Sequence, residues 1–344
     1  MDSRLPARII YFTGWLAPEM EGISKEVFTL ASHFKAPVIG ISKLQPFKID
    51  LARKAFGFSA KRYYLAKSVT FLLSRLFKIV HVYDSLDNWI YLSSVPKNTI
   101  LTGVVGEGTL PIKLYRKMAF IVVDDEEKRL RLIKRGIDPE KIKIIYPGID
   151  IKPYLEVPQP PPVPPFRVLF ASSPPASEEL KSRGVFDLLE VAERLPKVEF
   201  IFLWRPWGDS FPKIKGEIDK RGLKNIRLIC QKVQDIRKYF KECHVVIAPF
   251  REGGGKTCPT SILEALASGR PVILGPGVGM KKLVEEKGAG LYYNDCTQLP
   301  ALIEKISKEW VGYNSKAREL ALNFFSKEKF ISSYYQIYKQ LLGN

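Results

Sequence analysis

Short apolar runs alternate with amphipathic helical patterns along most of this chain. In the first half, runs of strand length span residues 7–12, 37–41, 79–83, 100–104, 120–123 and 142–146. In the second half, they span residues 167–171, 199–203, 226–230, 245–249, 271–274 and 290–293. Helical patterns separate many of these runs, as at residues 186–195 and 235–241. This alternation predicts an α/β fold in which helices cover parallel sheets.

A proline-rich segment divides the two series of strands. Residues 157–165 read VPQPPPVPP and hold six prolines, which cannot continue a helix or a central strand. We therefore predict an N-terminal domain (1–156), a stiff linker (157–165), a C-terminal domain (166–312) and a final helix (313–344) that packs back on the N-terminal domain. Ligands of doubly wound sheets bind at the carboxyl ends of the strands, so we expect two facing domains to form a cleft.

A glycine-rich loop followed by an abrupt helix start is the most informative local pattern. Residues 249–275 read PFREGGGKTCPTSILEALASGRPVILG. Gly253, Gly254 and Gly255 would let the backbone approach an anion, and a helix start offers N–H groups to it. Lys256 adds a cation, and Pro259 suits the first helical turn, with Thr257 or Cys258 as the cap. The segment predicts a phosphate site.

Composition adds a charge signal and few redox or metal signals. The 344 residues carry a net charge of +18, and 46% are hydrophobic. The four cysteines form no CxxC pair and the three histidines are scattered, so we expect no cofactor and no metal. The N-terminus, MDSRLPARIIYF, lacks a signal-peptide pattern, so we expect a cytoplasmic location.

Residues 43–78 concentrate much of the positive charge. They contain nine basic residues and one acid, a net charge of +8, interleaved with seven aromatic residues. Such a segment suits a helix on an anionic membrane surface, which would make the protein peripheral on the inner face of the membrane. A solvated lysine-rich face of a thermophile protein is an alternative, since Asn and Gln number only seven each. An RNA-binding face is a third interpretation, but no RNA-recognition signature appears, and we expect no nucleic-acid partner.

Several motifs resemble those of the retaining family-four glycosyltransferases, which have the GT-B fold. The resembling segments are IYPGIDIKPYLEV from Ile145, RGVFDLLEVAERLP from Arg183, CHVVIAPF from Cys243, SILEALASGRPVI from Ser261 and FSKEKFISSYYQIYKQLL from Phe325. The resemblance is dense in the C-terminal half and loose in the N-terminal half. It implies two Rossmann-like domains and a nucleotide-diphosphate sugar as donor.

The resemblance assigns roles to the glycine-rich loop and the helix after it. Glu264 falls on the family's second motif glutamate, which binds the ribose hydroxyls of the donor. The first motif glutamate should lie eight positions earlier, where this chain has Lys256. Either Glu252 takes its place or Lys256 contacts the diphosphate. The three glycines, with Thr257, Thr260 and Ser261 at the helix start, complete the expected donor contacts.

The resemblance also places cations on the diphosphate. Arg183 matches the family's lysine in a Lys-Gly pair and is expected to stabilise the leaving group. The family's arginine would fall near Ser172 and is missing. Lys181, Arg205 or Lys256 could substitute, and Lys256 adjoins the helix start.

Three further residues are expected to contact the donor. Backbone groups around Val233 would bind the base, and Gly22 lies in a loop that approaches the transferred sugar. Tyr83 stands where the family often has a histidine and can donate to a sugar hydroxyl. His81, two residues earlier, is expected to be a core residue.

These features predict a metal-independent transferase that retains anomeric configuration and uses a glycan or lipid-linked acceptor. In such a reaction the leaving phosphate can accept the proton of the acceptor, so positioning and charge stabilisation carry catalysis. A nucleotide-sugar 2-epimerase shares the architecture. A degenerate scaffold or binding subunit also stays open, because Lys256 replaces a glutamate and the second cation is missing.

Overall fold

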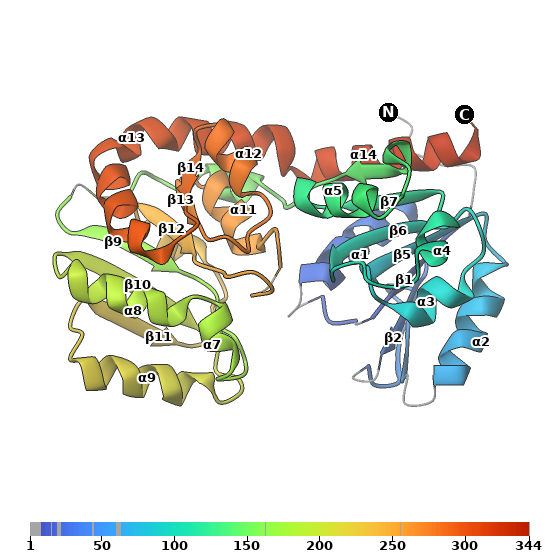
Figure 1. Cartoon of the computed structure of the whole chain (residues 1–344), viewed down its shortest axis with the longest axis horizontal. Helices are drawn as coiled ribbons and strands as arrows, with labels where there is room; N and C mark the ends of the chain where they lie inside the picture. Colours follow the sequence, from blue (N-terminus) through green and yellow to red (C-terminus); the bar gives the residue numbers. More distant parts are fainter. Residues whose placement is uncertain are drawn as a thin grey trace. The chain divides into compact units, whose positions relative to one another are not determined.

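The computed structural model describes residues 8–14, 16–18, 22–42, 45–59, 63–161, 163–254 and 256–343. The chain forms two compact units, each built on its own parallel or mostly parallel sheet (Figure 1). Unit 1 comprises Met1–Gly148 and Lys327–Asn344, and unit 2 comprises Ile149–Ser326. The α/β class predicted from strand–helix alternation is confirmed.

Unit 1 contains an eight-stranded sheet in the order β3-β4-β2-β1-β5-β6-β7-β8, and only the β3–β4 pair is antiparallel. Its strands are β1 (Ile9–Thr13), β2 (Val38–Ser42), β3 (Lys48–Asp50), β4 (Ala55–Ser59), β5 (Ile79–Ser85), β6 (Ile100–Val105), β7 (Phe120–Val123) and β8 (Ile142–Ile144). Its helices are α1 (Gly22–Phe34), α2 (Tyr63–Ser74), α3 (Trp89–Ser94), α4 (Ile112–Arg116), α5 (Glu126–Lys134), the 3-10 turn η1 (Pro139–Lys141) and α14 (Lys327–Leu342).

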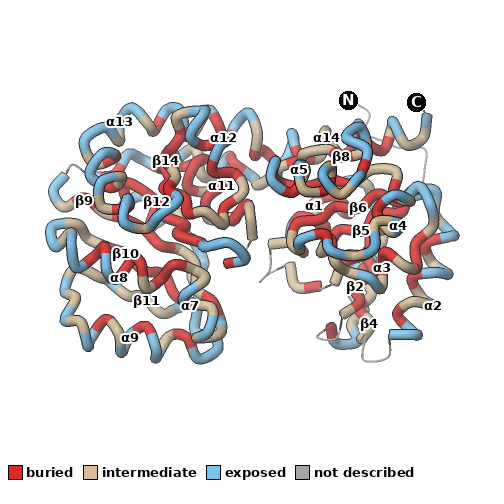
Figure 2. Tube along the Cα trace, in the orientation of Figure 1, coloured by how far each residue is buried: buried red, intermediate tan, exposed pale blue. Residues whose placement is uncertain are grey.

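The two faces of the unit 1 sheet follow the period of two along its strands. Ile9 and Tyr11 of β1 pack with α1 and α14 on one face. Ile10 and Phe12 pack with α2 to α5 on the other face. Because both faces are covered, the central strands are mostly apolar along both faces, which is typical of parallel sheets. Figure 2 shows the buried residues concentrated along the strands.

The C-terminal helix α14 is held on unit 1 by hydroxyl groups. The Tyr338 hydroxyl lies 2.9 Å from that of Tyr11 and 2.7 Å from Nδ1 of His81. The Tyr334 hydroxyl lies 2.9 Å from Oγ1 of Thr102. The helix predicted over 313–344 is corrected here, because the chain breaks at Phe325 into two helices and only the second belongs to unit 1.

Part of the basic segment forms strands that the sequence interpretation missed. Residues 43–78 suggested a helix, but β3 and β4 pair within them and extend the sheet edge. In β4, Ala55 and Gly57 are buried while Phe56 and Phe58 are partly exposed. Small residues therefore occupy the inner positions, which hides the usual alternation of large apolar and polar residues.

Unit 2 contains a six-stranded parallel sheet in the order β11-β10-β9-β12-β13-β14. Its strands are β9 (Phe166–Phe170), β10 (Val198–Trp204), β11 (Ile226–Cys230), β12 (Val245–Ala248), β13 (Val272–Leu274) and β14 (Gly290–Tyr292). Its helices are α6 (Lys152–Leu155), α7 (Glu179–Ser182), α8 (Val185–Arg194), α9 (Ser210–Arg221), α10 (Arg237–Phe240), α11 (Thr260–Ala267), α12 (Lys281–Glu286), the 3-10 turn η2 (Cys296–Gln298) and α13 (Leu299–Phe324).

The proline-rich segment belongs to unit 2, which corrects the predicted linker at 157–165. Arg318 donates to the carbonyl oxygen of Val157 at 2.7 Å, and Arg270 donates to that of Pro158. Nε2 of His244 donates to the carbonyl oxygen of Pro161 at 2.8 Å. These bonds give partners to the carbonyls of a segment whose prolines lack the N–H groups that a strand ladder needs. The division between the units therefore falls between Gly148 and Ile149.

Candidate functional site

The order of strands in unit 2 creates a switch point between β9 and β12. These strands are hydrogen-bonded neighbours, with Leu169 opposite Val246. The chain leaves β9 toward β10 on one side and leaves β12 toward β13 on the other. Loops that leave in opposite directions open a crevice at the carboxyl ends of the strands, where ligands of such sheets bind. The predicted phosphate loop follows β12 directly.

Backbone contacts join this loop to the turn between α7 and α8. The Arg251 N–H donates to the carbonyl oxygen of Ser182 at 2.8 Å, and the Gly254 N–H donates to that of Arg251 at 2.8 Å. A Cβ added at Gly254 would overlap the Ser182 carbonyl, and one added at Gly184 would overlap the Pro249 carbonyl. Glycine is therefore required at both positions by backbone-to-backbone packing.

This packing changes the interpretation of the three glycines. Gly254 is buried against the backbone of Ser182, so packing alone requires a glycine at this position, with or without a bound anion. Gly253 is exposed, has a φ of 71° and has open space beside its Cα. Of the two described glycines, Gly253 has the geometry that suits close approach to a ligand. Gly255 lies outside the described residues.

Arg183 lies at the switch point as a fixed cation. One of its terminal nitrogens donates to Oγ of Ser172 at 3.2 Å, and its guanidinium carbon lies 4.9 Å from the centre of the Phe250 ring. Its Nε is buried without a hydrogen-bond partner. Burial lowers the pKa of the guanidinium, but arginine stays charged in proteins. The side chain is 22% exposed, and one terminal nitrogen lies 3.8 Å from Oε2 of Glu179. A half-buried cation with an unused donor is the arrangement that an anionic ligand would complete.

An ion pair between Arg251 and Asp187 supports the same loop. Nε and one terminal nitrogen of Arg251 donate to the two carboxylate oxygens of Asp187, at 3.1 and 2.6 Å. Asp187 is buried in the first turn of α8, and its charge raises the pKa of Arg251. The sequence interpretation missed both residues. The available signal was an acid in the first turn of the RGVFD helix and a base directly after a buried strand.

Helix α11 begins later than the sequence predicted. Its first residue is Thr260, with Pro259 in the capping position instead of the first turn. Thr260 and Ser261 are half-buried in its first turn. Thr257 lies in the preceding loop, where its carbonyl oxygen accepts from the Gly279 N–H at 2.9 Å. The first N–H groups of the helix have no partner within it, so they are available to an anion.

Glu264 lies on α11 and contacts a residue near the start of unit 2. Its Oε1 accepts a 2.8 Å hydrogen bond from the hydroxyl of Tyr154, which lies on α6. Burial and the nearby charge of Glu264 raise the pKa of Tyr154. The phenol therefore stays protonated and donates, and one Glu264 oxygen is held in place. Tyr154 belongs to the segment resembling a family motif, but its role was not foreseen.

The other predicted residues of unit 2 are spread along the carboxyl edge of the sheet or beside it. Lys181 is exposed on α7, and Lys256 is half-buried beside α11. Arg205 follows β10, where its N–H donates to Oγ of Ser173 at 3.0 Å and its side chain lies over Trp207. Val233 is half-buried in the loop after β11, and Glu252 is exposed.

In unit 1 the structure contradicts the expected position of Tyr83. This residue lies inside β5 at 1% exposure, and its hydroxyl donates to Oε2 of Glu26 at 2.7 Å. A side chain so buried and bonded cannot reach a sugar hydroxyl from this position. His81 is a core residue as expected, with Nδ1 and Nε2 each 2.7 Å from a hydroxyl. Gly22 is half-buried at the first position of α1.

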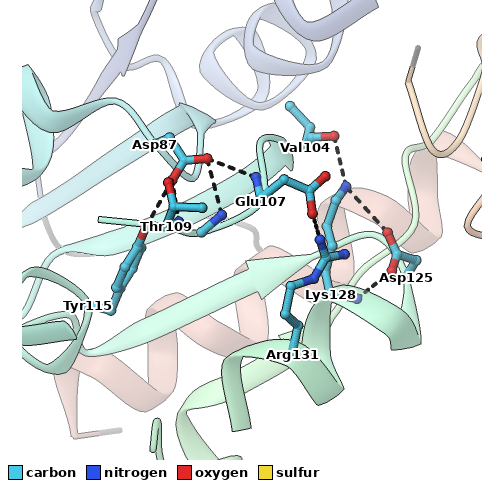
Figure 3. Close-up of polar contacts among 9 residues, drawn as sticks. Asp87, Val104, Glu107, Thr109, Tyr115, Asp125, Lys128 and Arg131 are labelled. Carbon is cyan, nitrogen blue, oxygen red and sulfur yellow. Dashed lines mark hydrogen bonds and ion pairs between the residues drawn. The ribbon is translucent and has the colours of Figure 1, made fainter. Parts of the chain in front are cut away.

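The loop after β6 in unit 1 is held by its own contacts. The Asp87 carboxylate accepts from the N–H groups of Glu107 at 2.8 Å and Gly108 at 3.1 Å, and Glu107 pairs with Arg131 (Figure 3). Beside it, Lys128 is buried between Asp124 and Asp125 and donates to the Val104 carbonyl oxygen at 3.0 Å. These contacts fix the loop and explain its glycines as turn residues.

Residues 169–309 match the family model "Glycosyl transferases group 1". Unit 2 is therefore a group 1 glycosyltransferase domain. The match runs from the end of β9 to the first part of α13 and contains the loops of the switch point. The predicted enzyme class, glycosyltransferase, is confirmed. None of the curated proteins matches the sequence.

Solved structures similar to the whole chain share its GT-B fold. HepE of Anabaena in complex with UDP has a TM-score of 0.74 at 15% identity and covers 97% of this chain and 100% of its own. A glycosyltransferase from Rickettsia africae has a TM-score of 0.75 at 16% identity, with 99% and 100% covered. The lipopolysaccharide outer core galactosyltransferase WaaB has a TM-score of 0.75 at 14% identity, with 96% and 99% covered.

The described part of this chain contains neither a membrane-spanning helix nor an evident metal cluster. None of its described helices combines the length and apolar character needed to cross a bilayer. No group of three or more His, Cys, Asp or Glu side chains lies together among the same residues. Metal independence stays a prediction.

Proposed function

We propose that this glycosyltransferase moves a sugar from a nucleotide-diphosphate sugar to an acceptor, with retention of anomeric configuration and without a metal ion. The observation that carries the proposal is the switch point of the group 1 domain. There Arg183, with a buried and unused donor, lies in the turn that packs on the loop before α11. HepE, which has the same fold, binds UDP and UDP-glucose, and this supports a nucleotide-sugar donor.

The expected chemistry needs little from the protein beyond binding and charge. The acceptor oxygen forms a bond to the anomeric carbon while the bond from that carbon to the β-phosphate oxygen breaks. A released phosphate oxygen takes the acceptor proton, so all atoms and electrons balance without a protein base. Negative charge grows on the diphosphate, where Arg183 and the start of α11 stabilise it. Glu264 accepts from the ribose hydroxyls.

A membrane-borne acceptor is supported by the surface of unit 1. Helix α2 turns small residues inward (Ala66, Thr70 and Ser74) and leaves large ones exposed. Leu72 is 63% exposed, and Leu76 just beyond the helix is 70% exposed. Among the described residues, nine of the fourteen large exposed hydrophobic side chains come from residues 47–76. An apolar surface within a segment of net charge +8 suits an anionic bilayer at the cell's inner face.

The donor proposal is tested by incubating the full chain with UDP-, GDP- and ADP-sugars, with and without glycan and lipid-linked acceptors. We expect nucleotide release from one base class and a product whose anomeric configuration, read by proton NMR, equals that of the donor. Inverted product would contradict retention. Free epimerised sugar nucleotide would identify the 2-epimerase instead.

The membrane proposal has its own test. Co-sedimentation with phosphatidylglycerol vesicles should be strong at low salt, weak at high salt, and weaker for the Leu65→Ser/Leu72→Ser variant. The matched control is Leu322→Ser, an exposed leucine of unit 2. Equal recovery with neutral and anionic vesicles would contradict an anionic membrane partner.

A scaffold role is the second candidate, and a specific observation favours it. Lys256 stands where the family's first glutamate is expected, and Glu252, the nearest upstream acid, is exposed. Nucleotide release from a sugar donor distinguishes an enzyme from a scaffold. A scaffold would bind nucleotide or nothing and would release none from any sugar donor, whereas an enzyme would release nucleotide more slowly after Arg183→Ala.

A further inference from the structure

A cavity of about 500 Å³ opens at the amino-terminal edge of the unit 1 sheet. Residues just before or at the start of β1, β2, β4 and β5 line it, including Ile9, Pro37, Lys54 and Phe77. Ligands of doubly wound sheets bind at the opposite, carboxyl-terminal edge. The cavity is therefore separate from the crevice that sugar transfer would use, and its volume lies within the range of small-molecule sites.

The rim of the cavity is positively charged. Arg8, Lys35 and Lys54 contribute to its lining, and no acidic residue lines it among the residues that the structure describes. Among the described residues no carboxylate pairs with any of the three, and each is exposed at the surface. The Lys54 ammonium donates to the carbonyl oxygen of Lys35 at 3.4 Å, which brings the two lysines together. Three cations around one opening favour an anionic group there.

The backbone of these two lysines is unusual. Lys35 has a φ of 54° and Lys54 a φ of 50°, in the left-handed region where glycine or asparagine is favoured. The third described non-glycine residue with positive φ is Asn98, which fits that preference. Two lysines held in strained positions at the mouth of one cavity point to a use for their side chains.

The interior of the cavity is apolar and rigid. Phe34 packs edge-on against Tyr338 with ring centres 5.1 Å apart. Phe56 and Phe77 pack against the opposite core of unit 1. Leu51, which also lines the cavity, is 76% exposed and continues the apolar surface of residues 47–76 to the opening. Aromatic walls anchored in two cores form a site that exists before any ligand enters.

We propose that this cavity binds an anionic amphiphile, with an alkyl chain against the aromatic walls and a phosphate head on Arg8, Lys35 and Lys54. The chemistry is shared by a membrane phospholipid and by a free alkyl phosphate. The proposal stands on the cavity alone and does not depend on sugar transfer, since the lining belongs to unit 1 and contains none of the donor residues.

The test uses the full chain and n-octyl phosphate in isothermal titration calorimetry. Inorganic phosphate carries the same head without the chain, and octyl glucoside carries the same chain without the charge. We expect octyl phosphate to bind at least tenfold tighter than either. Binding equal to that of octyl glucoside, or absent binding, would overturn the proposal.

The double variant Lys35→Gly/Lys54→Gly removes two positive charges and also relieves the backbone strain at both positions. We expect at least a tenfold loss of octyl phosphate affinity with no fall in melting temperature, because glycine suits both φ values. Asn98→Gly controls for the backbone change and Lys282→Ala for the loss of a surface charge, and both should bind as the wild type does. Arg8→Ala tests the third cation without touching either strained position. Unchanged affinity in both cavity variants would refute the assignment.

Vesicles distinguish the two sources of the ligand. If the double glycine variant also loses co-sedimentation with phosphatidylglycerol vesicles, the head group comes from membrane lipid. If it still binds vesicles but no longer binds octyl phosphate, the cavity takes a free amphiphile and α2 carries the membrane contact. In each case the loss of octyl phosphate binding supports the proposal.

Discussion

The hydroxyl of Tyr154 donates a 2.8 Å hydrogen bond to Oε1 of Glu264. Tyr154 lies on α6, six residues after the division between the units, and Glu264 lies on α11 beside the switch point. The bond joins the first helix of unit 2 to the carboxylate expected to bind ribose. If Glu264 binds the ribose, this bond gives α6 a physical role in donor binding.

Tyr154→Phe should weaken donor binding by about fivefold while kcat changes little, because one hydrogen bond to a carboxylate is lost but the ring still packs. Glu264→Gln should weaken binding further, since it removes the charge as well. Donor KM and nucleotide affinity measure both effects. A fall in kcat at constant KM after Tyr154→Phe would contradict a role in ground-state positioning.

Arg251→Ala should destabilise unit 2 by about 2 kcal/mol, because the buried Asp187 carboxylate loses its bidentate partner. The cost is not larger because the arginine site is partly exposed and solvent screens the charge. Arg251→Lys should lie between, since lysine cannot make the bidentate bond. Urea unfolding measures the change. Arg221→Ala, which breaks pairs with the more exposed acids Glu193 and Glu217, is the control and should cost about 1 kcal/mol or less.

Gly184→Ala and Gly254→Ala should each destabilise unit 2 by about 2 kcal/mol or more, because a Cβ at either position overlaps a neighbouring carbonyl oxygen. Gly216→Ala is the matched control. Gly216 lies in α9 with open space around it, so alanine should stabilise by about 0.5–1 kcal/mol. Thermal melts of the three variants give the comparison, and equal melting temperatures would show that the loops separate freely.

Acid should destabilise unit 1 through His81. Burial lowers the pKa of His81 from 6.5 to about 3, so below pH 6.5 the unfolded chain binds a proton that the folded chain does not. The free energy of unfolding therefore falls by roughly 1.4 kcal/mol per pH unit, or about 2 kcal/mol between pH 6.5 and pH 5. His81→Gln, which cannot titrate, should lack this share of the slope in urea unfolding. An identical slope in both proteins would show that His81 is protonated in the fold.

The sequence predicted the elements that bury large apolar residues and missed those that do not. Every strand predicted from an apolar run has a counterpart in the two sheets, whereas β4 escaped because Ala55 and Gly57 fill its inner positions. The domain division was misplaced for a related reason. A proline-rich segment shows no packing signal, and its contacts with Arg270 and His244 depend on residues far along the chain.

The same difference between local signals and long-range contacts decided which site residues could be predicted from the sequence. The loop after β12 and Arg183 could be singled out because their signals are local in the sequence, although α11 begins later than predicted and their donor-binding roles stay predictions. Tyr154 and the pair of Arg251 with Asp187 were missed, since each partner lies more than sixty positions away. Tyr83 was misassigned because a motif position says nothing about burial, and its partner Glu26 lies far away in sequence, on α1.

The most direct measurement of the central claim is calorimetric binding of UDP, GDP and ADP to the full chain and to Arg183→Ala. If Arg183 and α11 hold the diphosphate, one of the three nucleotides binds the wild type and binds Arg183→Ala at least tenfold more weakly, while Lys282→Ala is unaffected. Binding that is indifferent to Arg183, or no binding of any of the three, would contradict a diphosphate site at the switch point of unit 2.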